Sequence, residues 1–134
     1  MFLHTMTQTE RVAFVGLARA IVEADGVTHE AERDLLQAIA LEAGARIEDV
    51  PPRVVDDTLM EAFPTYRSRR AVMLELMGIA YADGSVHRSE SAVIADVARQ
   101  FKMAEEDVVW MDRWVVRQVG LAAEAERFLS QEGG

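Results

Sequence analysis

The chain has 134 residues, half of them hydrophobic, which is enough to fold as one domain around its own core. It contains no cysteine, so disulfide bonds and thiolate-bound metals are excluded, and a cytoplasmic location is expected. Its formal net charge of −9 repels phosphate groups, so nucleic acid binding is not expected, whereas basic partners and metal cations suit this charge.

The first predicted helix begins at a capping box made by Thr7 and Glu10, whose side chains satisfy each other's backbone amides. Apolar residues then recur with the i, i+3, i+4 spacing of an amphipathic helix. Asp25-Gly26 ends this helix, because glycine readily takes the left-handed conformation at a helix C-terminus. A second helix is expected over residues 30–44.

Five more helices are predicted in the rest of the chain. Pro51-Pro52 favours a helix start, since proline is tolerated in a first turn, and Pro64 ends that helix. Gly120 is expected to separate the last two helices. The predicted ranges are about 49–63, 66–82, 88–101, 105–119 and a short helix that ends near residue 130. No segment alternates apolar and polar residues as a strand would, so the fold is predicted to be an all-α, seven-helix bundle.

The most informative pattern is an internal match between Ala24-Asp25-Gly26 and Ala82-Asp83-Gly84, 58 residues further on. His29 and Glu32 match His87 and Glu90 at the same spacing. Shared turn residues are more specific than a shared apolar stripe, so the sequence predicts duplication of a helix–acidic turn–helix unit. The predicted repeats, at about residues 8–62 and 66–119, lie within one domain of residues 1–134. The predicted core includes Ile21, Leu36, Ile39, Ile79, Ile94, Val97 and Phe101.

Each acidic turn has a structural interpretation. Glycine ends one helix, His29 or His87 caps the next, and Glu32 or Glu90 closes a capping box. The glutamates also lie at the positive end of the helix dipole. Histidine is a weaker cap than serine, threonine, asparagine or aspartate.

The second interpretation of the acidic turns is a divalent-cation site with carboxylate oxygens as ligands. The candidate ligands are Asp25, Glu32, Asp83 and Glu90, with His29 and His87 less favoured. An EF-hand register fails, because Ile21 and Ile79 stand where the loop needs its first aspartate. Cation binding is therefore expected to be weak and centred on the first turn, which is the more acidic.

Residues 24–32 (ADGVTHEAE) and 82–90 (ADGSVHRSE) resemble the duplicated signature of the tellurite-resistance TerB-like family. That family includes the N-terminal region of a membrane-anchored DnaJ-like co-chaperone, and the resemblance covers roughly residues 8–119. It implies a seven-helix fold, a bacterial cytoplasmic setting and a role in stress response or complex assembly. It also implies metal binding by acidic residues, here Asp25, Glu32, Asp83 and Glu90. The second turn departs from the first, with Ser85, Arg88 and Ser89 in place of a more acidic pattern.

The residues give little support for catalysis. The chain has no nucleophile elbow and no glycine-rich loop placed to bind phosphate. The expected function is that of a non-catalytic binding or scaffolding domain. No cofactor is assigned, and a weakly bound divalent cation is the candidate ligand. The alternative is a metal-assisted hydrolytic enzyme that uses the acidic turns. Two turns in one cleft would favour the enzyme, and two separate turns would favour binding.

The helix predicted over residues 105–119 carries Trp110 and Trp114 beside other apolar residues. Either one tryptophan packs in the core, or the helix meets a protein partner or a second copy of the chain. The cluster Arg67, Arg69 and Arg70 is expected to be a solvated surface patch. No apolar stretch reaches the ~18 residues of a transmembrane helix. Membership of a membrane-associated complex stays compatible with the sequence.

Overall fold

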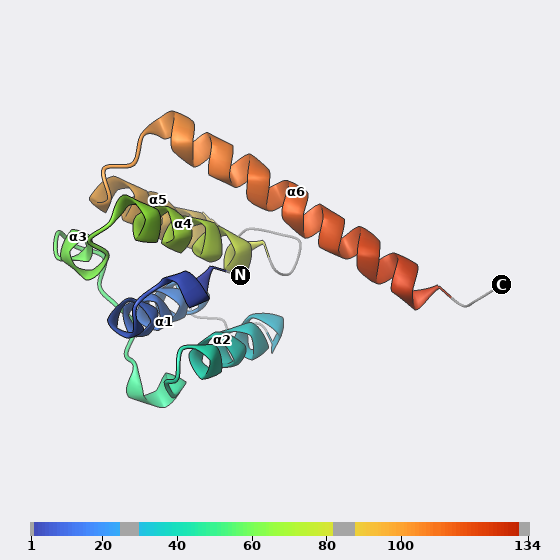
Figure 1. Cartoon of the computed structure of the whole chain (residues 1–134), viewed down its shortest axis with the longest axis horizontal. Helices are drawn as coiled ribbons and strands as arrows, with labels where there is room; N and C mark the ends of the chain where they lie inside the picture. The colour runs from blue at the N-terminus through green and yellow to red at the C-terminus, as the bar shows by residue number, and fades with distance from the viewer. Residues whose placement is uncertain (1, 25–29, 82–87, 132–134) are drawn as a thin grey trace.

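The computed structural model describes residues 2–24, 30–81 and 88–131 (Figure 1). Within these ranges the chain forms α-helices and short 3-10 helices and no strand, which confirms the all-α prediction. The elements are η1 (Leu3–Thr5), α1 (Gln8–Val22), α2 (Glu30–Glu42), η2 (Ile47–Asp49), α3 (Leu59–Ala62), α4 (Tyr66–Ala80), α5 (Arg88–Gln100) and α6 (Glu105–Ser130).

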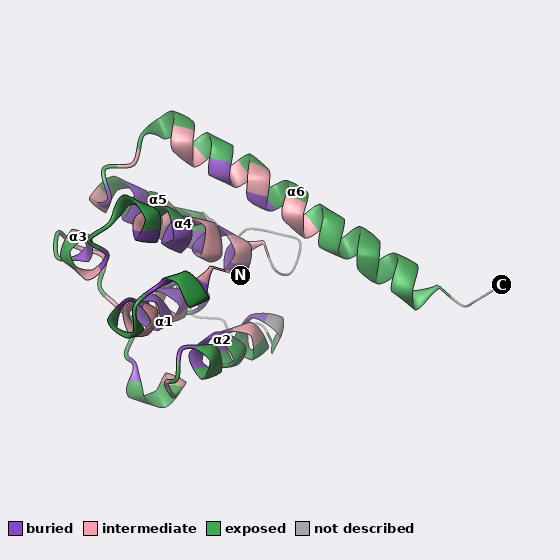
Figure 2. Cartoon of the chain, viewed as in Figure 1, coloured by how far each residue is buried: buried purple, intermediate pink, exposed green. Residues whose placement is uncertain are grey.

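Helices α1 and α4 lie side by side at the centre of the fold. Helix α2 packs on α1, α5 packs on both central helices, and α6 packs on α4. The buried faces of the helices turn toward one another (Figure 2). They form one core around fully buried side chains such as Phe14, Leu17, Val72 and Leu76. Of the seven predicted core residues, six are buried and Ile94 is only half-buried.

Helix α6 corrects the prediction of seven helices, since the described residues contain six α-helices. It runs through Gly120 without a break over 26 residues. A glycine in a helix interior costs about 1 kcal/mol relative to alanine, which weakens a helix but does not end it. The residues after Gly120 are mostly alanine, glutamate, leucine and arginine, which favour helix. Beyond Gly120 every residue of the helix is exposed, and the helix projects past the body of the fold (Figures 1 and 2).

The segment around Pro51 corrects the predicted start of the third helix. Val50 has the extended conformation, with φ −117° and ψ 103°, because a residue before proline is driven away from the helical region. No helix therefore starts at the prolines, and α3 is a single turn further on. The amide of Arg53 donates to the carbonyl of Gly16 at 3.0 Å, so this segment packs closely along α1.

The ends of α2 and α5 have the same backbone geometry at positions 58 residues apart. Gly44 has φ +72° and Lys102 has φ +52°, both in the left-handed region. The following amide then donates to the carbonyl five residues back, Ala45 to Ala40 at 2.9 Å and Met103 to Ala98 at 3.0 Å. Both helices thus end in a Schellman-type turn. The equivalence supports the internal repeat, and the predicted repeat boundaries stay predictions.

Candidate functional site

Each acidic turn is described only in part. Glu32 and Glu90 lie in the first turns of α2 and α5, each at the third helical position, and each is only 2% exposed. The other candidate ligands, Asp25, His29, Asp83 and His87, lie outside the described residues. In the described part of the chain, no group of three or more histidine, cysteine, aspartate or glutamate side chains is placed to hold a metal ion.

Glu10 provides an internal comparison for the two buried glutamates. It also lies at the third position of its helix and is 7% exposed. Its Oε1 accepts a hydrogen bond from the amide of Thr7 at 2.9 Å, and its own amide donates to Oγ1 of Thr7 at 3.1 Å. A capping glutamate is therefore buried in this fold without any acidic turn before it. The burial of Glu32 and Glu90, which both make interactions within the fold, suits the capping interpretation as well as a cation site.

The helix end before the first turn carries charge. Glu23 caps the C-terminus of α1, is exposed, and pairs with Arg19 at 3.1 Å, one helical turn away. The same arginine donates to the carbonyls of Ile47 and Val50 at 2.9 and 3.0 Å. Arg19 therefore ties η2 to α1 while it holds Glu23 beside the turn.

The helix end before the second turn carries a neutral aromatic residue instead. Tyr81 caps the C-terminus of α4, and its hydroxyl donates to Oδ1 of Asp112 on α6 at 2.7 Å. This hydrogen bond, followed by burial and the charge of Asp112, raises the pKa of Tyr81 to about 12. The two turns are thus flanked differently, the first by the ion pair of Glu23 with Arg19 and the second by the hydrogen bond from Tyr81 to Asp112.

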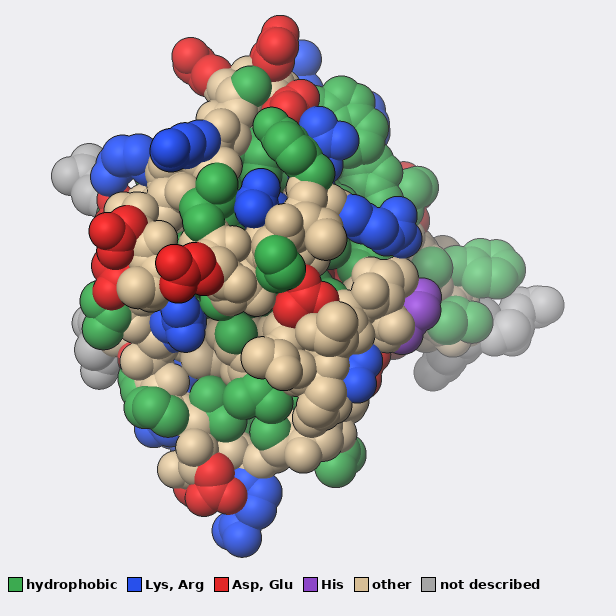
Figure 3. Space-filling view, turned by 60° about the vertical axis from the view of Figure 1, so that its left-hand side comes forward, with side chains coloured by type: hydrophobic (Ala, Val, Ile, Leu, Met, Phe, Trp, Pro, Cys, Tyr) green, Lys and Arg blue, Asp and Glu red, His purple; other side chains and the backbone are tan. Residues whose placement is uncertain are grey.

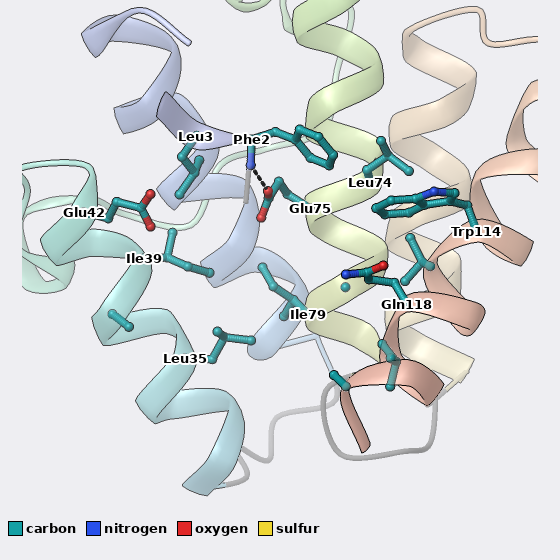
Figure 4. Close-up of a pocket in the computed structure, with 15 residues that line it drawn as sticks. Phe2, Leu3, Leu35, Ile39, Glu42, Leu74, Glu75, Ile79, Trp114 and Gln118 are labelled. Atoms are coloured by element: carbon teal, nitrogen blue, oxygen red, sulfur yellow. Dashed lines mark hydrogen bonds between the residues drawn. The ribbon is translucent and has the colours of Figure 1, made fainter. Parts of the chain in front are cut away.

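An apolar groove lies between α2, α4 and α6, beside η1 (Figure 4). Its volume is about 360 Å³. Apolar side chains that line it include Leu35, Ile39, Leu74, Ile79, Trp114 and Val119. Glu42, Glu75 and Gln118 add polar groups to its lining.

The N-terminal segment lines one side of this groove. The amide of Phe2 donates to Oε1 of Glu75 at 2.6 Å, and its ring centroid lies 6.1 Å from that of Trp114. Sequence reasoning points to Trp114 but not to the groove. The sequence feature that points to the groove is a pair of small residues, Ala38 and Gly78. They line the groove at positions where larger side chains would fill it.

A second surface feature, the aromatic–arginine patch, consists of Tyr66, Arg70 and Trp110. Tyr66 is 59% exposed and Trp110 is 58% exposed. The guanidinium carbon of Arg70 lies 4.9 Å from the ring centroid of Tyr66, and its Nη2 lies 3.6 Å from the carboxylate of Asp107. Arg67 and Arg70 are exposed, as a solvated cluster requires, whereas Arg69 is half-buried and donates to two backbone carbonyls.

Charged side chains of both signs are interspersed over the face that Figure 3 shows. On that face the acidic side chains are not gathered into one patch, although the chain as a whole carries a net charge of −9. No helix of the described ranges combines enough length with enough apolar character to cross a membrane.

Comparison with known proteins supplies two matches. The family model of tellurite resistance protein TerB matches residues 55–113, less than half of the chain, and this range contains the second acidic turn but not the first. The crystal structure of a tellurite resistance protein from Nostoc punctiforme has a TM-score of 0.68 and 21% sequence identity to this chain. The likeness covers 96% of this chain and 85% of that protein. No curated protein sequence matches the chain.

The two matches cover different parts of the molecule. Residues 55–113 include α3, α4, α5 and the first part of α6. The structural match extends over nearly the whole chain, and at this identity it shows a shared fold alone. The resemblance to the TerB family that the two acidic turns predict is therefore confirmed, and residues 55–113 match a domain of the tellurite-resistance type.

Proposed function

We propose that this chain is a non-catalytic binding or scaffolding domain of tellurite-resistance and stress-response type that acts in the cytoplasm. In this proposal it recognises a protein partner through the aromatic–arginine patch. The observation that carries the proposal is the exposure of Tyr66, whose ring Arg70 packs over, and of Trp110, which lines the same hollow as Arg70. Tyrosine, tryptophan and arginine are the side chains that most often dominate the binding energy of protein interfaces.

The patch is preorganised for binding. Arg70 is held between the ring of Tyr66 and the carboxylate of Asp107, so less side-chain entropy is lost when a partner docks. A hollow of about 350 Å³ lies beside it, lined by Arg70, Leu74, Trp110 and their neighbours. This hollow can accept a side chain of the partner, while Trp110 covers it from one side.

Survival of a tellurite-sensitive bacterial strain tests the proposal. The wild-type chain is expected to raise survival, and Trp110→Ser is expected to abolish the gain while the protein stays folded and equally abundant. Val54→Ser is the matched control, because Val54 is also apolar and 73% exposed but lies outside the patch. Full protection by Trp110→Ser would reject the patch as the binding surface. No protection by the wild-type chain would reject the tellurite-resistance role itself.

We also propose that the acidic turns bind a divalent cation weakly. The supporting observation is that Glu32 and Glu90, at matched positions of the two repeats, are both withdrawn from solvent. Asp25 and Asp83 would complete the two ligand sets, and His29 and His87 are less favoured ligands. A binding titration, described below, separates this site from simple helix capping.

A further inference from the structure

The exposed end of α6 continues an apolar pattern that begins inside the fold. Apolar pairs recur every seven residues, at Trp114-Val115, Leu121-Ala122 and Phe128-Leu129. The first pair lines the apolar groove, and Val115 is only 3% exposed. The last pair is 74% exposed at both residues. A seven-residue apolar repeat is typical of a helix that packs against another helix along its whole length.

No other helix of the described ranges lies beside the projecting segment, residues 121–130. All of its residues are exposed, and it extends beyond the body of the fold (Figure 2). The large apolar side chains of this segment, Leu121, Phe128 and Leu129, are exposed to water. A second molecule can cover them, because α6 is one continuous helix to Ser130 and directs the segment away from the described bundle.

The apolar groove adjoins this segment on the same helix. Ala122 lies at the edge of the groove, so the groove and the segment form one continuous apolar surface. The groove suits apolar side chains, because few of its lining groups can form hydrogen bonds with water. It is bounded by polar side chains, Glu42 on α2 and Gln118 on α6.

We propose that two copies of this chain associate through an antiparallel pairing of α6, with residues 121–130 of each copy lying in the groove of the other. In a pairing centred on Ala122, Leu129 of one copy comes opposite Val115 of its partner, since each is seven residues from the centre. Glu126 likewise comes opposite Gln118, which offers an amide donor to the carboxylate. The small residues Gly120, Ala122 and Ala123 let the two helices approach closely.

The arrangement is a self-complementary, two-fold dimer, in which one patch made of a groove and a tail meets an identical patch. The contact is independent of the aromatic–arginine patch, so it leaves that surface available for a different protein.

Sedimentation equilibrium of the full chain tests the dimer. Wild-type protein is expected to form dimers in the micromolar range. Phe128→Ser with Leu129→Ser is expected to raise the dissociation constant by about tenfold or more. This tail variant changes only exposed side chains, so its effect does not depend on folding. Leu41→Ser is the control, because Leu41 is 81% exposed and does not line the groove.

A second variant blocks the groove instead of the tail. Gly78 lines the groove, and a Cβ atom added there meets nothing within 4 Å, so Gly78→Phe is expected to fold and to fill the space. It should weaken the dimer as the tail variant does. An equimolar mixture of tail and groove variants should form heterodimers, because one intact tail then meets one intact groove.

Two results would overturn the dimer. One is a wild-type chain that stays monomeric at every concentration, and the other is a dimer that the tail variant leaves unchanged. Trp110→Ser should dimerise normally, so failure of the dimer and failure of the proposed partner surface give different results.

Discussion

The hydroxyl of Tyr81, at the C-terminus of α4, donates a 2.7 Å hydrogen bond to Oδ1 of Asp112 in α6. The two residues lie 31 positions apart, so this bond joins helices that are distant in the sequence. It fixes α6 against the end of α4, beside the second acidic turn. Its acceptor is a carboxylate, and the pKa of Tyr81 is raised to about 12, mainly by this hydrogen bond.

Tyr81→Phe is therefore expected to lower the free energy of unfolding by about 1 kcal/mol near pH 7. The pKa of tyrosine is about 10 in an unfolded chain and higher in this fold. The bond's contribution is thus fully present below pH 10 and is lost as the pH rises toward about 12. Urea unfolding of both proteins at pH 7 and above pH 10 measures this. A difference that stays constant over that range would contradict the assigned role of the hydroxyl.

Two matched positions in the repeat are expected to respond differently to cavity formation. Leu36 is 5% exposed, whereas its repeat partner Ile94 is only half-buried. Leu36→Ala should cost about 2–5 kcal/mol through lost burial and a cavity, and Ile94→Ala should cost roughly half as much or less. Denaturant unfolding of the two variants supplies the comparison. Equal losses of unfolding free energy would contradict the difference in burial between Leu36 and Ile94.

Substitutions in the Schellman-type turns after α2 and α5 are expected to change the stability of the protein in opposite directions. Lys102 occupies the left-handed region at φ +52°, which is strained for a residue with a side chain, so Lys102→Gly should stabilise the protein by about 0.5–1 kcal/mol. Gly44 occupies the equivalent position at φ +72°, so Gly44→Ala should destabilise it by about 1 kcal/mol. Thermal unfolding of both variants checks the signs. The idea fails if both changes have the same sign.

Continuity of α6 predicts the effect of changing Gly120. Gly120 lies inside the helix, and an added Cβ meets nothing within 4 Å, so Gly120→Ala should stabilise the helix by about 0.5–1 kcal/mol. Helix content by circular dichroism should stay the same or rise. A loss of stability would instead favour the break between two helices that the sequence suggests at this position.

Local chemistry accounts for what the sequence predicts correctly. Thr7 and Glu10 lie three residues apart, and their capping box forms as the spacing predicts. The helix starts before Glu32 and Glu90 also agree with the sequence, because each glutamate is at the third helical position. These features depend on residues within one helical turn of each other.

The wrong predictions arise where a local preference competes with its surroundings. Pro51 permits a helix start, but the following proline and the contact of Arg53 with Gly16 favour extended backbone. Gly120 weakens a helix, but the strong helix formers after it keep α6 intact. Sequence reasoning misses the groove, because its lining brings together Phe2 and Glu75, which are 73 residues apart and joined by a hydrogen bond.

The glutamates of the acidic turns have two interpretations, helix capping and cation binding, which a metal titration separates. Calorimetric titration with calcium, magnesium, manganese and zinc is expected to show binding in the ~10⁻⁴–10⁻³ M range. Asp25→Asn with Glu32→Gln should abolish the signal, and Asp83→Asn with Glu90→Gln should reduce it less, because the first turn is the more acidic. Glu10→Gln is the matched control, since Glu10 is a buried capping glutamate with no acidic turn before it. It should lower stability and leave cation binding unchanged. Absence of binding at millimolar metal, with Glu32→Gln as destabilising as Glu10→Gln, would leave capping as the only role of these glutamates.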